Sequence, residues 1–130
     1  MIYFDTSALV KLVFEEDESS ALAEWIADRV DLPKVSSELS VVELLRTCRR
    51  VDETALNSAT LLLDGLDLLP VSNFIVQQAA AIVPSEIRSL DAIHLASALT
   101  IGDHLVAFVA YDHRLSSAAQ QAGMVIATPE

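Results

Sequence analysis

The sequence predicts an α/β fold: a single domain with a central parallel β-sheet of about five strands, flanked by helices on both sides. Short apolar runs alternate along the chain with longer helical segments, which is the pattern of parallel strands joined by helices. The chain has 130 residues, of which 52% are hydrophobic, and only three glycines. Disordered and low-complexity chains do not have this composition, so residues 1–130 are expected to form one domain with a buried core.

The predicted strands are short runs of β-branched, aromatic or aliphatic residues. The first is the clearest, because Ile2, Tyr3 and Phe4 are residue types that suit a buried strand. The later runs are recognised by the same residue types between polar breaks. The expected strands are 2–5, 34–36, about 67–71, 105–111 and 124–127.

The predicted helices show apolar residues at helical spacing. Gly102 and Gly123 each follow the end of such a segment, where a left-handed residue is favoured. The expected helices are about 7–14, 18–29, 37–50, 53–64, 73–83, 90–101 and 113–122.

The charge and the cysteine content restrict the possible binding partners and the cellular compartment. With 8 basic and 19 acidic residues, the formal charge of −11 argues against sequence-independent nucleic-acid binding and favours a cationic partner or metal ions. The single cysteine, Cys48, cannot form an internal disulfide, and no segment has the pattern of a secretion signal or the roughly 20 apolar residues of a membrane helix. We expect a cytoplasmic protein without a membrane contact.

Two predicted strands finish in an aspartate, Asp5 after "MIYF" and Asp112 after "LVAFVAY". The carboxyl ends of parallel strands meet at one sheet edge, where ligands bind in such folds. Each aspartate could instead cap the helix that follows it. Since Thr6 and Ser7 can also start the first helix, we expect Asp5 to be free of that role. For Asp112, capping and metal binding are compatible.

Glu43 lies in "SELSVVELLRTCRR", on the side of the predicted helix opposite its apolar face. It shares that side with Arg46, Thr47 and Arg50. One interpretation is a solvated face with ion pairs between neighbouring turns, and the other is a functional carboxylate.

Asp91 lies in "SLDAIHLASAL", where apolar residues surround nearly the whole helix. A helix of this kind is buried, so its carboxylate needs an explanation. A structural explanation is that Ser89 caps the helix and Asp91 complements the helix dipole. That explanation leaves the second polar residue on the same side, His94, unexplained.

If the four carboxylates converge, they need cations. Two unit charges about 5 Å apart repel by roughly 3 kcal/mol at an effective dielectric near 20, so the acids would raise one another's pKa values or bind metal. Oxygen ligands without a cysteine or histidine cluster select Mg²⁺ or Mn²⁺, ions that also bind substrate phosphates. Such a metal would generate an attacking hydroxide and stabilise the leaving oxygen of a phosphodiester.

Four segments, in order along essentially the whole chain, resemble the PIN-domain family and most closely its bacterial VapC-type toxins. They are "DTSALVKL", "VVELLR", "SLDAIHLASAL" and "VAYDHRL". The resemblance implies an Mg²⁺- or Mn²⁺-dependent endoribonuclease that acts on RNA, commonly tRNA or rRNA. It also implies a homodimer and inhibition by a cognate antitoxin protein.

Carried over by position, the resemblance assigns the catalytic and metal-binding roles to Asp5, Glu43, Asp91 and Asp112. Thr6 and Ser7 match the hydroxyl residues that would orient Asp5 or a metal-bound water. The chain departs from the family at Ala110, where a Thr or Ser is common.

Two charged groups have open interpretations. The only dense basic group, Arg46, Arg49 and Arg50, either contacts RNA or forms a solvated helix face. The acidic run at 15–18 suits the start of a helix and solubility, or attracts a basic antitoxin segment.

Other functions are considered beside the toxin hypothesis. They are a PIN-fold RNA-processing nuclease outside a toxin–antitoxin pair, and a module that binds metal or partners without catalysis. A phospho-receiver module lacks support, because Thr6 stands where an acidic pair is expected and the last lysine is Lys34. A metal-independent ribonuclease would need two histidines, and His94 and His113 are the candidates.

Overall fold

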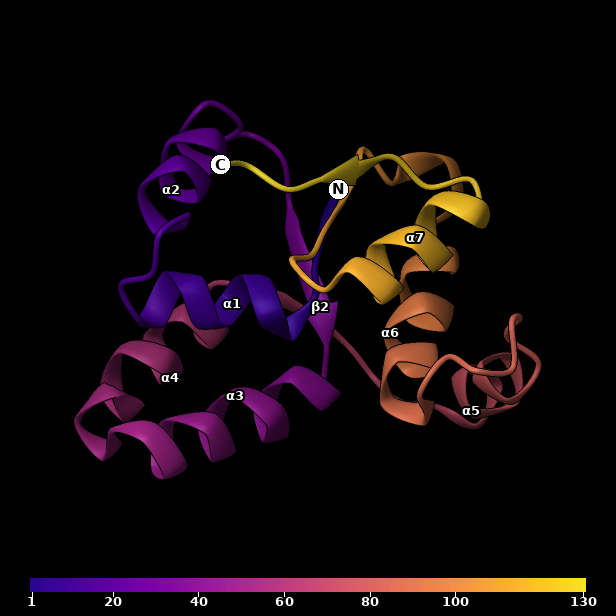
Figure 1. The fold of residues 1–130 in the computed structure, drawn as a ribbon, viewed down its shortest axis with the longest axis horizontal. Helices are drawn as coiled ribbons and strands as arrows, with labels where there is room; N and C mark the ends of the chain where they lie inside the picture. The colour runs from indigo at the N-terminus through magenta and orange to yellow at the C-terminus, as the bar shows by residue number, and fades with distance from the viewer.

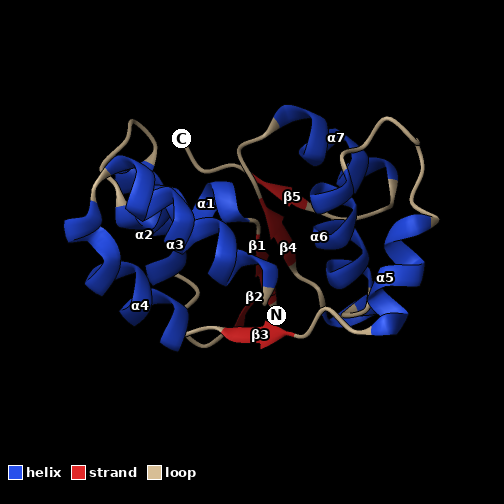
Figure 2. Cartoon of the chain, turned by 90° about the horizontal axis from the view of Figure 1, so that it is seen from below, coloured by secondary structure: helices blue, strands red, loops and turns tan.

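A computed structural model describing residues 1–130 contains one five-stranded parallel sheet with helices on both faces (Figures 1 and 2). The strand order is β3-β2-β1-β4-β5. This confirms the predicted fold class and the presence of all five strands. Their bounds are β1 Ile2–Phe4, β2 Lys34–Ser37, β3 Asp67–Leu69, β4 Ala107–Val109 and β5 Ile126–Ala127.

All seven predicted helices are present, with ends shifted by a few residues. The segment predicted as one helix at 53–64 is divided, because Asp52 caps a short 3₁₀-helix, Glu53–Ala55, through a bond from the Thr54 N–H. Gly102 and Gly123 have positive φ angles of 62° and 91°, as their positions predict. No helix combines the length and the apolar character needed to cross a membrane. The α-helices are α1 Thr6–Val13, α2 Ser19–Ala27, α3 Leu39–Val51, α4 Leu56–Asp64, α5 Asn73–Ala80, α6 Ser89–Leu99 and α7 His113–Gln121.

The order in which strands are added to the sheet changes side between β1 and β4. From β1 the chain adds β2 and β3 on one side, and then β4 and β5 on the other. Tyr3 pairs with Phe108, and the Asp5 N–H extends the ladder to the Val109 carbonyl at 2.9 Å. This switch point is where open α/β sheets bind ligands.

Alternate residues of β1 enter two separate cores. Ile2 and Phe4 pack with α1 to α4, whereas Tyr3 stacks on Phe108 among residues of α6 and α7, with ring centroids 5.3 Å apart. Figure 1 shows α1 to α4 on one side of the sheet and α5 to α7 on the other. The alternation follows from the two-residue period of a strand.

The acidic run at 15–18 lies directly before α2, at the predicted helix start. Lys11 contacts two of its carboxylates, Glu16 at 3.1 Å and Glu18 at 2.7 Å, and lies 4.7 Å from the centre of the Tyr111 ring. Part of the run therefore pairs with a cation of the same chain.

Leu44→Ala is expected to lower the free energy of unfolding by about 2–5 kcal/mol, because it removes a fully buried side chain between α3 and the sheet. Val42→Ala on the same helix is the control: Val42 is 56% exposed, so a change within about 0.5 kcal/mol is expected. Urea unfolding midpoints measure both. Equal losses in the two variants would contradict this description of the core.

Candidate active site

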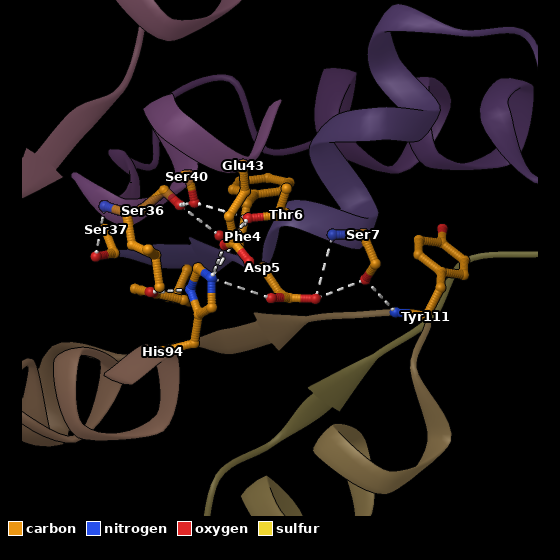
Figure 3. Close-up of polar contacts among 12 residues, drawn as sticks. Phe4, Asp5, Thr6, Ser7, Ser36, Ser37, Ser40, Glu43, His94 and Tyr111 are labelled. Atoms are coloured by element: carbon orange, nitrogen blue, oxygen red, sulfur yellow. Dashed lines mark hydrogen bonds and ion pairs between the residues drawn. The ribbon is translucent and has the colours of Figure 1, made fainter. Parts of the chain in front are cut away.

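Asp5 ends β1 at the switch point and is only 5% exposed. Its Oδ2 accepts hydrogen bonds from the Ser7 N–H at 3.2 Å and the Ser7 hydroxyl at 2.7 Å (Figure 3). Asp5 therefore caps α1, and the expectation that Thr6 and Ser7 would relieve it of this role is wrong. The reason is the backbone: residue 5 keeps the extended conformation that an N-cap requires, whereas Thr6 is already helical.

Ser7 connects the beginning of α1 to the chain after β4. While its hydroxyl donates to Asp5, its oxygen accepts the Tyr111 N–H at 2.9 Å. The Asp5 side chain is thus held by Ser7, which is itself hydrogen-bonded to the segment that follows β4.

Asp112 starts α7 and is exposed. Its Oδ1 accepts the Leu115 N–H at 2.9 Å, which is the helix-capping alternative. In both aspartates one carboxylate oxygen caps a helix, and the other has no hydrogen-bond donor within bonding distance. The nearest approach is His94 Nε2, 3.5 Å from Asp5 Oδ1. Capping therefore leaves one oxygen of each available as a ligand.

Glu43 is half-buried and points into the site. Its Oε1 accepts the Thr6 hydroxyl at 2.7 Å and lies 2.7 Å from His94 Nε2, and it forms no ion pair with an arginine of α3. The solvated-face interpretation of Glu43 is therefore wrong. Burial favours a higher pKa for this carboxyl, but the bonds from His94 and Thr6 outweigh burial and lower the pKa below its usual value.

His94 joins three elements of the fold. It is 1% exposed on α6, its Nδ1 lies 2.7 Å from the Tyr3 hydroxyl of β1, and its Nε2 bonds Glu43 of α3. Nε2 carries a hydrogen, since an ionised Glu43 can only accept. Burial favours a lower pKa for His94, but the Glu43 bond and the charge of Asp5 outweigh burial and raise it.

Asp91 lies in the first turn of α6 and forms no hydrogen bond or ion pair. Its pKa is raised by partial burial and then by the charges of Asp5 and Asp112, against the opposing effect of His94 and Arg88. Asp91 is therefore electrostatically coupled to both capping aspartates. Ser89 does not cap α6, because Arg88 occupies the cap position and makes no side-chain bond there.

A hydroxyl cluster behind Thr6 was not predicted from the sequence. Ser36 at the end of β2 donates to the Phe4 carbonyl at 2.7 Å and bonds Ser40, which lies 3.1 Å from Thr6 (Figure 3). The repeated serines of "VSSELS" at a strand end were the available signal. The sequence marks His94 as a polar residue in a buried helix and as one candidate for a histidine mechanism, but nothing in it signals the bond to Glu43.

Arg46, Arg49 and Arg50 are exposed on α3 and form no ion pair. They share a helix with Glu43 but do not contact its carboxylate. The structure thus joins Asp5, Thr6, Glu43 and His94 through direct contacts, with Asp91 and Asp112 coupled by charge.

Comparison with known proteins identifies the family. The PIN domain family model matches residues 2–121. The chain belongs to the PIN-domain family. Among proteins similar to this PIN domain, Ribonuclease VapC47 of Mycobacterium tuberculosis is 44% identical over 132 residues, covering 99% of this chain and 97% of the relative. Ribonuclease VapC35 of the same species is also 44% identical, over 131 residues, with the same coverage.

Solved structures support the PIN fold. The toxin VapC20 of M. tuberculosis, described as cleaving the sarcin–ricin loop, superposes with a TM-score of 0.79 at 20% identity, over 99% of this chain and all of that one. A chain of a toxin–antitoxin complex from Klebsiella pneumoniae gives 0.74 at 17% identity, over 100% and 98% of the two chains.

The side chains of this PIN domain suit a hard divalent cation, but they are not arranged as a finished set of ligands. No three His, Cys, Asp or Glu side chains are already positioned around one metal position, and Glu43 is turned toward Thr6 and His94. The donors that remain are carboxylate oxygens of Asp5, Asp91 and Asp112. This all-oxygen set is the chemistry that Mg²⁺ and Mn²⁺ select.

In the absence of divalent ions, Asp91→Asn is expected to raise the melting temperature of this PIN domain at neutral pH. A carboxyl whose pKa is raised on folding destabilises the fold when ionised, so the gain shrinks as the pH falls toward 3.8, the ordinary value. Solvent screening limits the gain to roughly 0.5 kcal/mol, or about 2 °C for a domain of this size. Differential scanning fluorimetry in EDTA measures it, and a lower melting temperature at neutral pH would contradict the described repulsion.

Proposed function

We propose that this PIN domain is an Mg²⁺- or Mn²⁺-dependent endoribonuclease, the toxin of a toxin–antitoxin pair, neutralised by a cognate antitoxin. The observation that carries the proposal is that Asp5 and Asp112 follow neighbouring parallel strands at the switch point of the sheet, each with one carboxylate oxygen free of hydrogen bonds. The names of the relatives, Ribonuclease VapC47 and VapC35, support the substrate class. We extend the toxin role to this chain from the VapC20 toxin and the toxin–antitoxin complex whose fold it shares.

Asp5, Asp91 and Asp112 would hold the metal, with Glu43 beside them. When bound, the cation lowers the pKa of a water and stabilises negative charge on the phosphate being cleaved. Ser7 fixes one oxygen of Asp5 and directs the other into the site. Thr6 and His94 hold Glu43 ionised at the edge of the site, where it can accept a proton from a water.

The partners follow from the same proposal. We assign Arg46, Arg49 and Arg50 to contact with RNA phosphates, because they are exposed and unpaired beside the Glu43 segment. The substrate would be a tRNA or rRNA, and the active form a homodimer. A toxin–antitoxin complex from Klebsiella pneumoniae and VapBC2 from Rickettsia felis, with TM-scores of 0.74 and 0.73, illustrate the kind of antitoxin complex we propose.

Asp5→Asn and Asp91→Asn are each expected to reduce metal-dependent RNA cleavage by at least about a hundredfold, because each removes a negative ligand. Asparagine still serves as an N-cap, so Asp5→Asn should keep α1 intact. Asp64→Asn is the matched control, since Asp64 is exposed at the end of α4, away from the sheet edge. Cleavage is followed by gel electrophoresis with circular dichroism on each variant. Wild-type rates in both site variants would refute the proposal.

RNA cleavage by the wild type is expected to stop in EDTA, to return with excess Mn²⁺ or Mg²⁺, and to leave 5′-phosphate ends. Calorimetric titration should show uptake of either ion, with weaker binding in Asp91→Asn. A histidine mechanism through the 2′-hydroxyl would leave cyclic phosphates and survive EDTA. Folded protein that takes up no ion and cleaves no RNA would instead be a binding module without catalysis.

Expression of the wild-type chain is expected to arrest bacterial growth, and Asp91→Asn is expected to relieve the arrest. Co-expression of the gene next to its own should restore growth if that gene encodes the antitoxin. Colony counts and a pull-down of the two proteins measure this. Cleavage in vitro without arrest, and without capture of the neighbouring product, would favour an RNA-processing nuclease.

A further inference from the structure

A cavity of about 600 Å³ lies between residues 84–87 and one face of α7. Residues 84–87 lead into α6, whose first turn carries Asp91. The other wall, α7, begins directly after Asp112. The cavity is therefore bounded by the two chain segments that deliver these aspartates. Its volume is within the range of about 300–1,000 Å³ that small-molecule ligands occupy.

The α7 wall presents hydrogen-bonding groups at helical spacing. Arg114, Ser117 and Gln121 all line the cavity, at intervals of three and four residues, so they share one face of the helix. Ile87 adds an apolar surface on the opposite wall. Arginine offers only donors in a fork that matches a phosphate, and glutamine offers both a donor and an acceptor to a base edge.

Arg114 is one of five cations that the fold leaves without an ion pair or hydrogen bond. Of the 8 lysines and arginines in the chain, Lys11, Arg29 and Lys34 bond side-chain or backbone oxygens. The other five fall into two groups. Arg46, Arg49 and Arg50 lie on α3, the helix of Glu43, and Arg88 and Arg114 lie on the segments of Asp91 and Asp112.

Unpaired arginines are unexpected in a chain whose formal charge is −11, because acidic partners are in excess. Nineteen acidic side chains were available, and none pairs with these five arginines. All five instead lie close in sequence to a candidate site carboxylate: the α3 group follows Glu43, Arg88 precedes Asp91, and Arg114 follows Asp112. A polyanionic strand bound at the carboxylates would have these cations as its available partners.

We propose that this cavity binds a nucleotide of the RNA strand adjacent to the cleaved phosphate, with Arg114 contacting a phosphate and Gln121 and Ser117 the base or sugar. The inference rests on the proposed function and deepens it. Glu86 also lines the cavity; its carboxylate repels a phosphate and accepts from a base amino group, which directs the phosphate toward Arg114. Hydrogen bonding to the edges of unstacked bases is the usual way in which proteins recognise single-stranded RNA.

The test is binding of a fluorescein-labelled, random-sequence, short single-stranded RNA pool to the full chain by anisotropy, with Mg²⁺ present. All variants carry Asp5→Asn, so that RNA is not consumed. Arg114→Gln is expected to weaken binding about tenfold and to reduce the slope of log affinity against log salt by about 0.7, the loss of one phosphate contact. Ser117→Leu fills the cavity without changing charge and is expected to weaken binding with an unchanged slope.

Gln120→Glu is the matched control. It lies on the same helix, is exposed, does not line the cavity, and changes the net charge by the same amount as Arg114→Gln. Its effect on affinity should stay within about twofold, as for a distant surface charge. The proposal would be overturned if Arg114→Gln and Gln120→Glu weakened RNA binding equally, or if Arg114→Gln left the salt slope unchanged. Either result would favour a protein partner for the cavity.

Steady-state cleavage separates this inference from the proposed function. In the otherwise wild-type chain, Arg114→Gln is expected to raise KM about tenfold with kcat within about twofold, because it removes binding rather than chemistry. A wild type that cleaves RNA normally while Arg114→Gln leaves KM unchanged overturns the subsite alone. A wild type that cleaves no RNA with Mg²⁺ or Mn²⁺ overturns both.

Discussion

The hydrogen bond between His94 and Glu43 is the interaction on which the rest of the site depends. It joins residues 51 positions apart, on α3 and α6. The ring that makes this bond is held by Tyr3, which is fully buried at the centre of β1. Glu43 is therefore positioned by the hydrophobic core, through a tyrosine and a histidine, rather than by an ion pair along its own helix.

The acidic residues differ in how they are held. Asp5 and Asp112 are fixed by backbone N–H groups at the beginnings of α1 and α7, whereas Glu43 is fixed by side chains and Asp91 by its helix alone. A cation entering the site would find one oxygen of each capping aspartate free of hydrogen bonds.

The sequence alone was sufficient for the architecture and for the placement of Asp5 and Asp112 after neighbouring parallel strands, because alternation of strand and helix and the geometry of a parallel sheet are local rules. Capping by Asp5 depends on the backbone angles of one residue, which composition does not reveal. The apolar run 105–111 was too long as a strand, because Leu105 enters the core outside the ladder and Tyr111 turns to the Pro129 carbonyl. The contact of His94 with Glu43 required the folded chain, since nothing near either residue signals the other.

The double use of Asp5 and Asp112 affects how descendants of this protein would diverge. A lineage that lost nuclease activity would still be under selection to begin α1 and α7 properly, and aspartate would persist at both positions for that reason. Asp91 caps no helix and forms no side-chain bond, so relaxed selection would erase it first. An intact Asp91 is therefore a better sign of an active relative than the aspartates that precede α1 and α7.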